Sequence, residues 1–347
     1  MCKSLLPFLL IIASLRVQTP ERMRPDNDLF RVNGGKPLVD AHNCYPEDGK
    51  WANRIDRALS TGLPVAIEQD IAGYRDPATG QLIPKVAHGP KVGESEPTLR
   101  AYFFERVRPI IEKALAGDKK RWPVIVLHFD FKDNSPDLLR AVWKLLGEYE
   151  TWITTAPKGD DPKRLEAFTW KPLLVLTEDN DNQQQVFFDA VPVGQSLRLF
   201  GSAHTNEGFL KGLTRRQAVY AMAHAAPEQL LTEAPTNYRR WWNNGWAVVE
   251  EGGQRQAGEW TTEDQQRLTR VVDYAHRLGY WIRFYTLDGF SSQESQGWNQ
   301  GYNFGSRPAV EARWQAALAA GVDMIATDQY EDLAKFRATV SAASNRK

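Results

Sequence analysis

Short apolar segments alternate with longer segments of helical period along most of the chain. Apolar runs bounded by Gly, Pro or polar residues predict strands at 38–42, 64–71, 123–131, 173–177, 197–202, 238–243, 281–287 and 323–327. The segments between them predict helices at 51–60, 98–116, 136–148, 183–190, 215–231, 262–278, 307–320 and 330–341. Thr261 precedes one of these helices and Gly279 follows it, in the places of an N-cap and a helix-ending glycine.

Strands that alternate with helices in this way favour a single α/β domain, a (β/α)8 TIM barrel over residues 37–342. The 347 residues suit one large barrel or two ordinary domains, but no repeat or linker divides the chain. A doubly wound open sheet is the alternative. Because no Gly-x-Gly-x-x-Gly turn follows the first strand, a dinucleotide site is not supported. Residues 343–347 form a polar tail.

The N-terminal segment has the pattern of a secretory signal peptide. Lys3 is followed by an apolar run at 5–15, which predicts a signal peptide over residues 1–19. The run is shorter than the ~20 residues that span a membrane, and a buried N-terminal helix is the alternative. Residues 20–36 then form an extended lead-in. We therefore expect a secreted or periplasmic protein with no transmembrane helix in its mature chain.

Composition narrows the class of protein further. Lys plus Arg and Asp plus Glu each number 43, so the excess of cations that drives nucleic acid binding is missing. Cys2 falls inside the signal peptide, which leaves Cys44 alone in the mature chain and excludes an intramolecular disulfide. The hydrophobic fraction of 42% is that of a globular protein. The 12 tryptophans are the one unusual number.

Two carboxylates share one face of the second predicted strand. Side chains two residues apart in a strand point the same way, so Glu68 and Asp70 lie together. Val65 and Ile67 point the other way, towards the helices, which directs both carboxylates into the barrel at the end of the strand. Like charges this close are unfavourable unless a cation or a proton lies between them. An exposed edge strand of alternating polarity is the alternative.

The third predicted strand repeats this pattern. His128, Asp130 and Lys132 share one face, and the opposite face is apolar. Asp130 and Lys132 would therefore reach the barrel mouth beside Glu68 and Asp70. Three carboxylates are the hard oxygen ligands that Ca²⁺ or Mg²⁺ prefers, so the pattern predicts one such ion. A structural ion pair between Asp130 and Lys132 is the alternative.

Two histidines are expected beside the same cluster. His42 ends the first strand, and His88 lies in the long loop after the second. Because an imidazole titrates near neutral pH, one could take a proton from an attacking hydroxyl while the other protonates the leaving group. A single histidine is more often structural, but two beside one cluster favour catalysis. With a metal ion and Lys132 to neutralise charge, they would act on a phosphate.

This set of residues resembles the superfamily of phospholipase C-like phosphodiesterases. That superfamily includes glycerophosphodiester phosphodiesterases, phosphatidylinositol-specific phospholipases C and sphingomyelinase D-type enzymes. Its pattern is a histidine after strand one, Glu-x-Asp on strand two, a second histidine, and an acidic residue on strand three, often with Lys two positions later. In this chain the corresponding residues are His42, Glu68, Asp70, His88, Asp130 and Lys132. The resemblance covers 38–132 and 280–335, and the middle of the chain matches poorly.

Some residues of this chain depart from that pattern, and they indicate which branch of the superfamily it resembles. Asn43 follows the first histidine, where glycerophosphodiester phosphodiesterases usually carry Arg and phospholipases C carry an Asn that helps to hold the metal. His88 is similar to the second histidine of the phospholipases C, whereas Asp130 with Lys132 resembles the sphingomyelinase D-type strand. The resemblance thus implies Asn43 as a further metal ligand, in a branch with its own substrate.

The C-terminal part adds two candidate substrate-binding residues. The segment 283–288 resembles the aromatic-Thr-x-Asn/Asp strand of the superfamily, which implies that Tyr285 and Asp288 touch substrate, as Lys132 would. The segment 321–328 resembles its closing strand.

Aromatic residues gather at or after the sixth predicted strand and after the seventh. Trp241, Trp242 and Trp246 form one group, and Trp298 lies in a Gly/Asn/Gln-rich stretch with Tyr302 and Phe304. In a barrel, loops at this end carry function, so these side chains could enter a lipid surface or stack on sugars. Packing that steadies the loops is the alternative.

The sequence therefore predicts a secreted, divalent-metal-dependent phosphodiesterase that acts on a glycerophosphodiester or a phospholipid head group. We expect a monomer that can touch a membrane surface peripherally. Two alternatives are a barrel glycosidase that uses the aromatic residues, and a non-catalytic barrel that binds lipid or glycan. The head group and the choice of Ca²⁺ or Mg²⁺ are left open.

Overall fold

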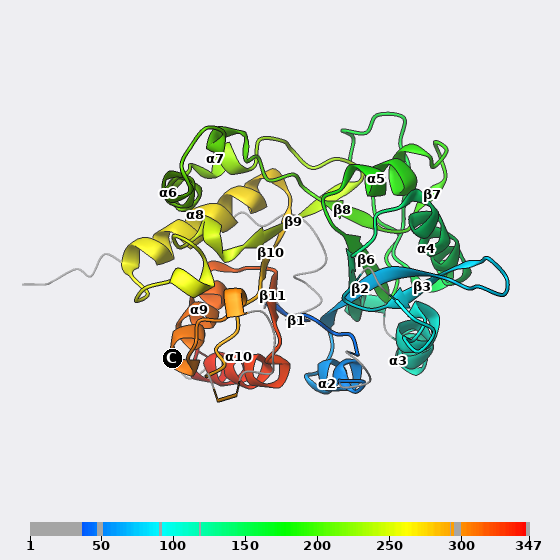
Figure 1. The fold of residues 1–347 in the computed structure, drawn as a ribbon, viewed down its shortest axis with the longest axis horizontal. Coiled ribbons are helices and arrows are strands. Elements are labelled where there is room, and N and C mark those ends of the chain that lie inside the picture. Colours follow the sequence, from blue (N-terminus) through cyan, green and yellow to red (C-terminus); the bar gives the residue numbers. More distant parts are fainter. Residues whose placement is uncertain are drawn as a thin grey trace, which may run out of the picture.

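The computed structural model describes residues 37–46, 51–89, 92–117, 119–291, 293–294 and 300–344. Eight parallel strands form a closed barrel, because each pairs with the next and β1 pairs with both β2 and β11. The strands are β1 (Leu38–Ala41), β2 (Val65–Arg75), β4 (Ile125–Phe131), β6 (Leu173–Thr177), β8 (Phe200–Ser202), β9 (Arg239–Gly245), β10 (Trp281–Tyr285) and β11 (Met324–Thr327). Figure 1 shows them around the centre of the molecule, with helices outside. The predicted barrel is confirmed.

Helices cover the outer face of the barrel (Figure 1). They are α2 (Arg54–Ser60), α3 (Glu105–Leu115), α4 (Pro136–Glu148), α5 (Asp181–Gln184), α6 (Arg215–His224), α7 (Pro227–Leu230), α8 (Thr262–Leu278), α9 (Arg307–Ala320) and α10 (Tyr330–Ser344). Short 3-10 or π-helical turns are η1 (Arg100–Phe104), η2 (Lys119–Arg121), η3 (Glu150–Trp152), η4 (Gln185–Asp189), η5 (Gly208–Leu210), η6 (Trp246–Val248), η7 (Gln254–Gln256) and η8 (Gln300–Tyr302). Within the described ranges, no helix combines the length and apolar character needed to cross a membrane. The predicted signal peptide and lead-in lie outside the described residues.

Two predicted elements are divided in the structure. The helix expected at 215–231 is α6 followed by α7, because Ala225 and Ala226 are extended and Pro227 begins a new helix. The strand expected at 197–202 is also split. Its first part, β7 (Ser196–Leu197), pairs with β5 (Ala156–Pro157) outside the barrel, and β8 alone joins the barrel sheet.

The second strand is longer than predicted, and its extension positions His88. β2 continues to Arg75 and folds back as β3 (Leu82–Val86), which is antiparallel to it. The Asp76 side chain closes the turn by accepting hydrogen bonds from the Ala78 N–H and the Thr79 hydroxyl. The hairpin returns the chain to the barrel, where the Ala87 N–H donates to the Asp70 carbonyl at 3.0 Å. His88 is thereby brought back to the end of β2.

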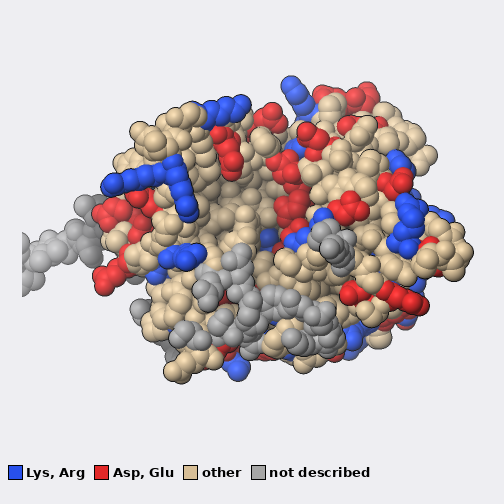
Figure 2. All heavy atoms as spheres, in the orientation of Figure 1, with Lys and Arg blue, Asp and Glu red and all other residues tan. Residues whose placement is uncertain are grey.

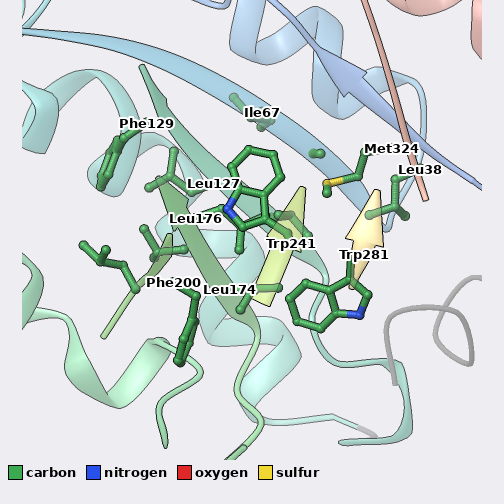
Figure 3. Close-up of a cluster of buried hydrophobic side chains, with 14 of the residues drawn as sticks. Leu38, Ile67, Leu127, Phe129, Leu174, Leu176, Phe200, Trp241, Trp281 and Met324 are labelled. Carbon is green, nitrogen blue, oxygen red and sulfur yellow. The ribbon is translucent and has the colours of Figure 1, made fainter. Parts of the chain in front are cut away.

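The lower interior of the barrel is apolar, and the interior nearer the mouth is polar. Figure 3 shows Trp241 and Trp281 among the apolar side chains of this core, which include Leu38, Leu174 and Met324. Side chains two residues apart share a strand face, so the next inward-pointing residue on each strand lies one layer nearer the mouth. On several strands this next residue is polar. These polar residues are Asp40, Glu68, His128 and Arg283, which are buried, and Asn243, which is half-buried. The polar residues of the site therefore pack directly on the apolar core of the barrel.

The tryptophans that were predicted to lie at the barrel mouth are part of the core. Trp241, Trp242 and Trp246 are all fully buried, and each indole N–H donates to an acceptor inside the protein. Packing is thus confirmed as their role, and burial excludes them as lipid-inserting or sugar-stacking side chains. Trp298 lies outside the described residues.

Removing the N-cap of α8 should cost stability. Thr261 Oγ1 accepts from the Asp264 N–H at 3.2 Å, and the Asp264 carboxylate accepts from the Thr261 N–H at 2.9 Å. We expect Thr261→Ala to lower the free energy of unfolding by about 1 kcal/mol, measured in urea. Thr262→Ala, at the next position, is the matched control. Equal losses in the two variants would contradict the capping role.

Candidate active site

Three carboxylates from two neighbouring strands converge at one end of the barrel. Glu68 and Asp70 lie on β2 and Asp130 on β4, and the parallel register places Asp70 opposite Asp130. One oxygen atom from each residue lies within 4.8 Å of those of the other two. Figure 2 shows Asp and Glu side chains along one wall of the hollow at the centre of the molecule, with basic side chains beside them. The predicted carboxylates are thus brought together.

The two oxygens of the buried Asp70 carboxylate have different surroundings. Oδ2 lies 2.6 Å from His88 Nδ1 and 3.1 Å from Lys132 Nζ. Oδ1 is buried and has no hydrogen-bond partner among the residues that the structure describes. A buried carboxylate oxygen without a partner, beside two further carboxylates, is unfavourable unless a cation binds there. The set therefore fits a hard cation such as Ca²⁺ or Mg²⁺, and Asp130, with 36% of its side chain exposed, leaves the cluster accessible.

A buried network holds Glu68 from the inside of the barrel. Its Oε2 accepts from Arg283 Nη2 at 2.5 Å and lies 3.3 Å from His128 Nδ1. Arg283 also donates to Asp40, so one buried cation balances two carboxylates. Burial alone would raise the pKa of Glu68, but the charges of His42, Arg283 and His128 outweigh it and hold that pKa well below its usual range. Glu68 is therefore ionised.

His42 directly follows β1 and lies against Glu68 from another side. Its Nδ1 is 3.0 Å from Asp328 Oδ1, and its Nε2 is 3.2 Å from Thr286 Oγ1 and 3.5 Å from Glu68 Oε1. Burial lowers the pKa of His42, but the carboxylates of Glu68 and Asp328 outweigh burial and raise it to about 9. His42 is therefore a charged imidazolium at neutral pH in these surroundings.

Asn43 orients two of these carboxylates. Its φ of 51° lies in the left-handed region, which Asn tolerates better than most residues. This turn directs the Asn43 N–H to Glu68 Oε1 at 3.3 Å and the side-chain amide to the Asp328 carboxylate at 3.1 and 3.2 Å. Metal ligation by Asn43 stays a prediction.

His88 lies on the solvent side of the cluster. Its side chain is 60% exposed, and the ring stacks on Tyr45 with a centroid distance of 5.3 Å. Asp70 holds Nδ1, so Nε2 is the nitrogen available to a substrate. Because His42 contacts Glu68 and His88 contacts Asp70, the two imidazoles flank the cluster from different sides.

Lys132 is a charged group at the same place. Its Nζ lies 2.6 Å from Asp130 Oδ2 and 3.1 Å from Asp70 Oδ2. Burial lowers the pKa of Lys132, but these two carboxylates outweigh burial and raise that pKa above its usual range. The pKa of the neighbouring Asp130 is also raised, to about 6, because Asp130 is buried beside the carboxylates of Asp70 and Glu68. The Lys132 ammonium group is thus paired with two carboxylates of the cluster, and its contact with a substrate stays a prediction.

The two candidate substrate residues from the C-terminal part have different positions. Tyr285 is half-buried at the end of β10, and burial raises the pKa of its hydroxyl to about 12. Asp288 is 4% exposed and accepts from Thr327 Oγ1 at 2.6 Å and from the Asp328 N–H at 2.7 Å. These contacts support Asp328, which in turn holds His42. A substrate role for either residue stays a prediction.

Several residues that organise the site were not predicted to belong to it. His128 and Arg283 occupy inward positions of predicted strands, and Asp328 directly follows the last predicted strand in the same alternation. This alternation is the signal that could have identified them. Glu178, which directly follows the predicted strand at 173–177, lies 2.7 Å from His128 Nε2 and accepts from Asn243 Nδ2 at 3.1 Å.

Stability should depend on pH through Asp288. Burial, with the nearby Asp328, raises the pKa of Asp288 from 3.8 to about 8. A carboxyl group with a raised pKa in the folded state stabilises the fold fully below about pH 4, and the contribution is lost as pH rises through 8. Asp288→Asn keeps the acceptor oxygen but cannot ionise. We therefore expect this variant to gain stability relative to wild type between pH 4 and 8, measured by urea unfolding.

The control for this experiment is Asp137→Asn, a carboxylate with 63% of its side chain exposed at the start of α4. Its stability relative to wild type should stay nearly constant over the same range. A constant difference between wild type and the Asp288→Asn variant would contradict the assignment.

No protein-family model and no curated protein matches this chain. Among solved structures, it is similar to a glycerophosphodiester phosphodiesterase from Parabacteroides distasonis, with 12% identity, a TM-score of 0.47, and coverage of 88% of this chain and 98% of that one. A glycerophosphoryl diester phosphodiesterase from the same organism has 11% identity, a TM-score of 0.40, and coverage of 92% and 94%. HPPK-DHPS from Plasmodium falciparum has 11% identity, a TM-score of 0.46, and coverage of 90% and 49%.

Because the TM-scores are below 0.5 and the third match carries a different name, these similarities do not select an activity. The barrel itself is established by the pairing of its own strands.

Proposed function

We propose that this chain is a divalent-metal-dependent phosphodiesterase that cleaves a glycerophosphodiester or a phospholipid head group. The observation that carries the proposal is the meeting of three carboxylates, two histidines and a lysine at one end of the barrel. Their order along the chain is the one that resembles the phospholipase C-like phosphodiesterases.

Glu68, Asp70 and Asp130 would hold one Ca²⁺ or Mg²⁺, with Asn43 as a further ligand. When bound, the ion would neutralise charge on a phosphate oxygen. Lys132 supplies a second positive charge beside Asp70 and Asp130, where it would bind the same phosphate.

The proton transfers fall to His42 and His88. The raised pKa of His42 favours it as the acid that protonates the leaving oxygen. His88 Nε2, on the solvent side, would take the proton from the attacking hydroxyl. Asp328 and Asp70 hold the other nitrogen of each ring, which fixes the orientation in which the proton moves.

We further propose that the enzyme is exported. Residues 1–19 would be removed as a signal peptide, and the mature enzyme would act outside the cytoplasm as a monomer, on a small diester or at a membrane surface. N-terminal sequencing of the protein recovered from a secreting host tests the first of these statements.

Purified protein should release phosphate monoester or cyclic phosphate from glycerophosphodiesters or phosphoinositides, and ³¹P NMR distinguishes these two products. Glycan hydrolysis that survives loss of both His42 and His88 would instead indicate a barrel glycosidase. Metal binding without hydrolysis of any diester would indicate a binding protein.

A further inference from the structure

The two histidines of the site are held to different degrees. The His42 ring is buried and has a carboxylate near each of its nitrogens. The His88 side chain is 60% exposed, and among the described residues only Asp70 lies within hydrogen-bond distance of it. One hydrogen bond fixes the position of Nδ1, but the imidazole can still turn about that bond. A second contact is needed to fix the direction in which Nε2 points.

The ring of Tyr45 makes that second contact. Its centroid lies 5.3 Å from that of the His88 ring, and the two planes are nearly parallel, at 15°. Tyr45 is only 1% exposed, so close packing holds its ring in place. Because stacked rings of this kind attract each other, the contact restricts the His88 imidazole to one plane.

Buried side chains from three elements hold the segment that carries Tyr45. Each of the three carbonyl groups before it accepts a hydrogen bond from a buried donor: Tyr330 of α10 to His42, Arg54 of α2 to Asn43, and Gln69 of β2 to Cys44. The Arg54 guanidinium also lies 6.0 Å from the centroid of the Tyr45 ring, within the range of a cation–π contact. The ring is therefore a rigid support for an exposed imidazole.

We propose that Tyr45 is a positioning residue for His88. Asp70 sets the position of Nδ1 and the Tyr45 ring sets the plane of the imidazole, so that together they direct Nε2 towards the proton of the attacking hydroxyl. One short segment would then orient both imidazoles of the site, since it carries His42 itself and supports His88 through Tyr45. This inference rests on the proposed phosphodiesterase function.

The test measures kcat and KM for glyceryl p-nitrophenyl phosphate at saturating Ca²⁺ or Mg²⁺. The p-nitrophenolate group leaves without being protonated, so the rate reports the step in which His88 takes a proton. Tyr45→Leu removes the ring and should lower kcat about 10-fold with little change in KM, because a misdirected base slows proton transfer and leaves binding intact. Tyr45→Phe keeps the ring and should restore most of this loss.

The matched control is Tyr280→Leu. Tyr280 is also 1% exposed, but it precedes β10 and therefore lies at the opposite end of the barrel from the site. This variant also removes a buried ring, so it should lose stability in urea while it keeps wild-type kcat.

Two further measurements separate positioning from a general effect on the fold. In a His88→Asn background, Tyr45→Leu should have no further effect on kcat, because no imidazole is left to orient. The ring current of Tyr45 should also shift the carbon-bound imidazole protons of His88 upfield in the NMR spectrum of wild type. This shift should disappear in Tyr45→Leu, and it does not depend on any hydrolysis.

Several results would overturn the inference. Equal losses of kcat in the wild-type and His88→Asn backgrounds, or equal losses in Tyr45→Leu and Tyr45→Phe, would show that the stack on His88 is not the cause. Weaker metal binding by Tyr45→Leu, measured by titration calorimetry, would mean that the ring acts through the carboxylate cluster. An active wild type with no change in Tyr45→Leu would refute the positioning role alone, whereas an inactive wild type would refute the phosphodiesterase function itself.

Discussion

Replacing His42 with Asn should lower kcat for hydrolysis of a glycerophosphodiester by about 10² to 10⁴, the usual contribution of a general acid or base. His42 lies between Asp328 and Glu68, within 3.0 and 3.5 Å of their carboxylate oxygens. An Asn side chain can still donate to Asp328 but cannot transfer a proton. The loss should therefore appear in kcat, while the circular dichroism spectrum and the urea midpoint stay close to those of wild type.

The matched control is His204→Asn. The Nδ1 of His204 also lies 2.6 Å from a carboxylate, that of Asp179, but its side chain is 70% exposed and its contacts lie outside the carboxylate cluster. This variant should keep wild-type kcat. If the His42→Asn variant also kept it, proton transfer by His42 would be excluded.

Replacing Asp70 with Asn should weaken the binding of Ca²⁺ or Mg²⁺ by about 100-fold or more. Removing even an indirect partner of a metal site typically costs 10- to 100-fold in affinity, and Asp70 would be a direct ligand. Its buried Oδ1 has no hydrogen-bond partner in the described part of the chain, so this is the oxygen that a cation would bind. Titration calorimetry of the purified protein with each metal chloride measures the effect without any substrate.

Asp137→Asn removes the same charge from an exposed position and should leave metal affinity unchanged. Equal affinities in wild type and the Asp70→Asn variant would show that the ion binds elsewhere.

The barrel was predictable because its eight strands follow the apolar runs and its helices follow the helical period. The hairpin of β2 and β3 was not, since it depends on a turn closed by the Asp76 side chain rather than on an apolar pattern. Nor could the sequence show that Trp241, Trp242 and Trp246 are buried. A tryptophan at the end of a strand or just after it has the same pattern whether it packs inwards or faces solvent, so only the folded structure distinguishes the two.

The carboxylates of the site were predictable because two-residue spacing on a strand places Glu68 and Asp70 on one face. Their supporting partners were not, because these come from distant parts of the chain. Asp328 is 286 residues from His42, and Arg283 is 215 residues from Glu68. Strand spacing shows which way such residues point, but only barrel closure determines which of them meet.

The most direct test of the proposed mechanism is the rate of glycerophosphodiester hydrolysis as Ca²⁺ or Mg²⁺ is titrated into chelator-treated protein. We predict that the treated protein is inactive and that activity returns to a plateau at one bound ion per chain. Full activity in excess EDTA would contradict the metal-dependent phosphodiesterase proposed for this cluster.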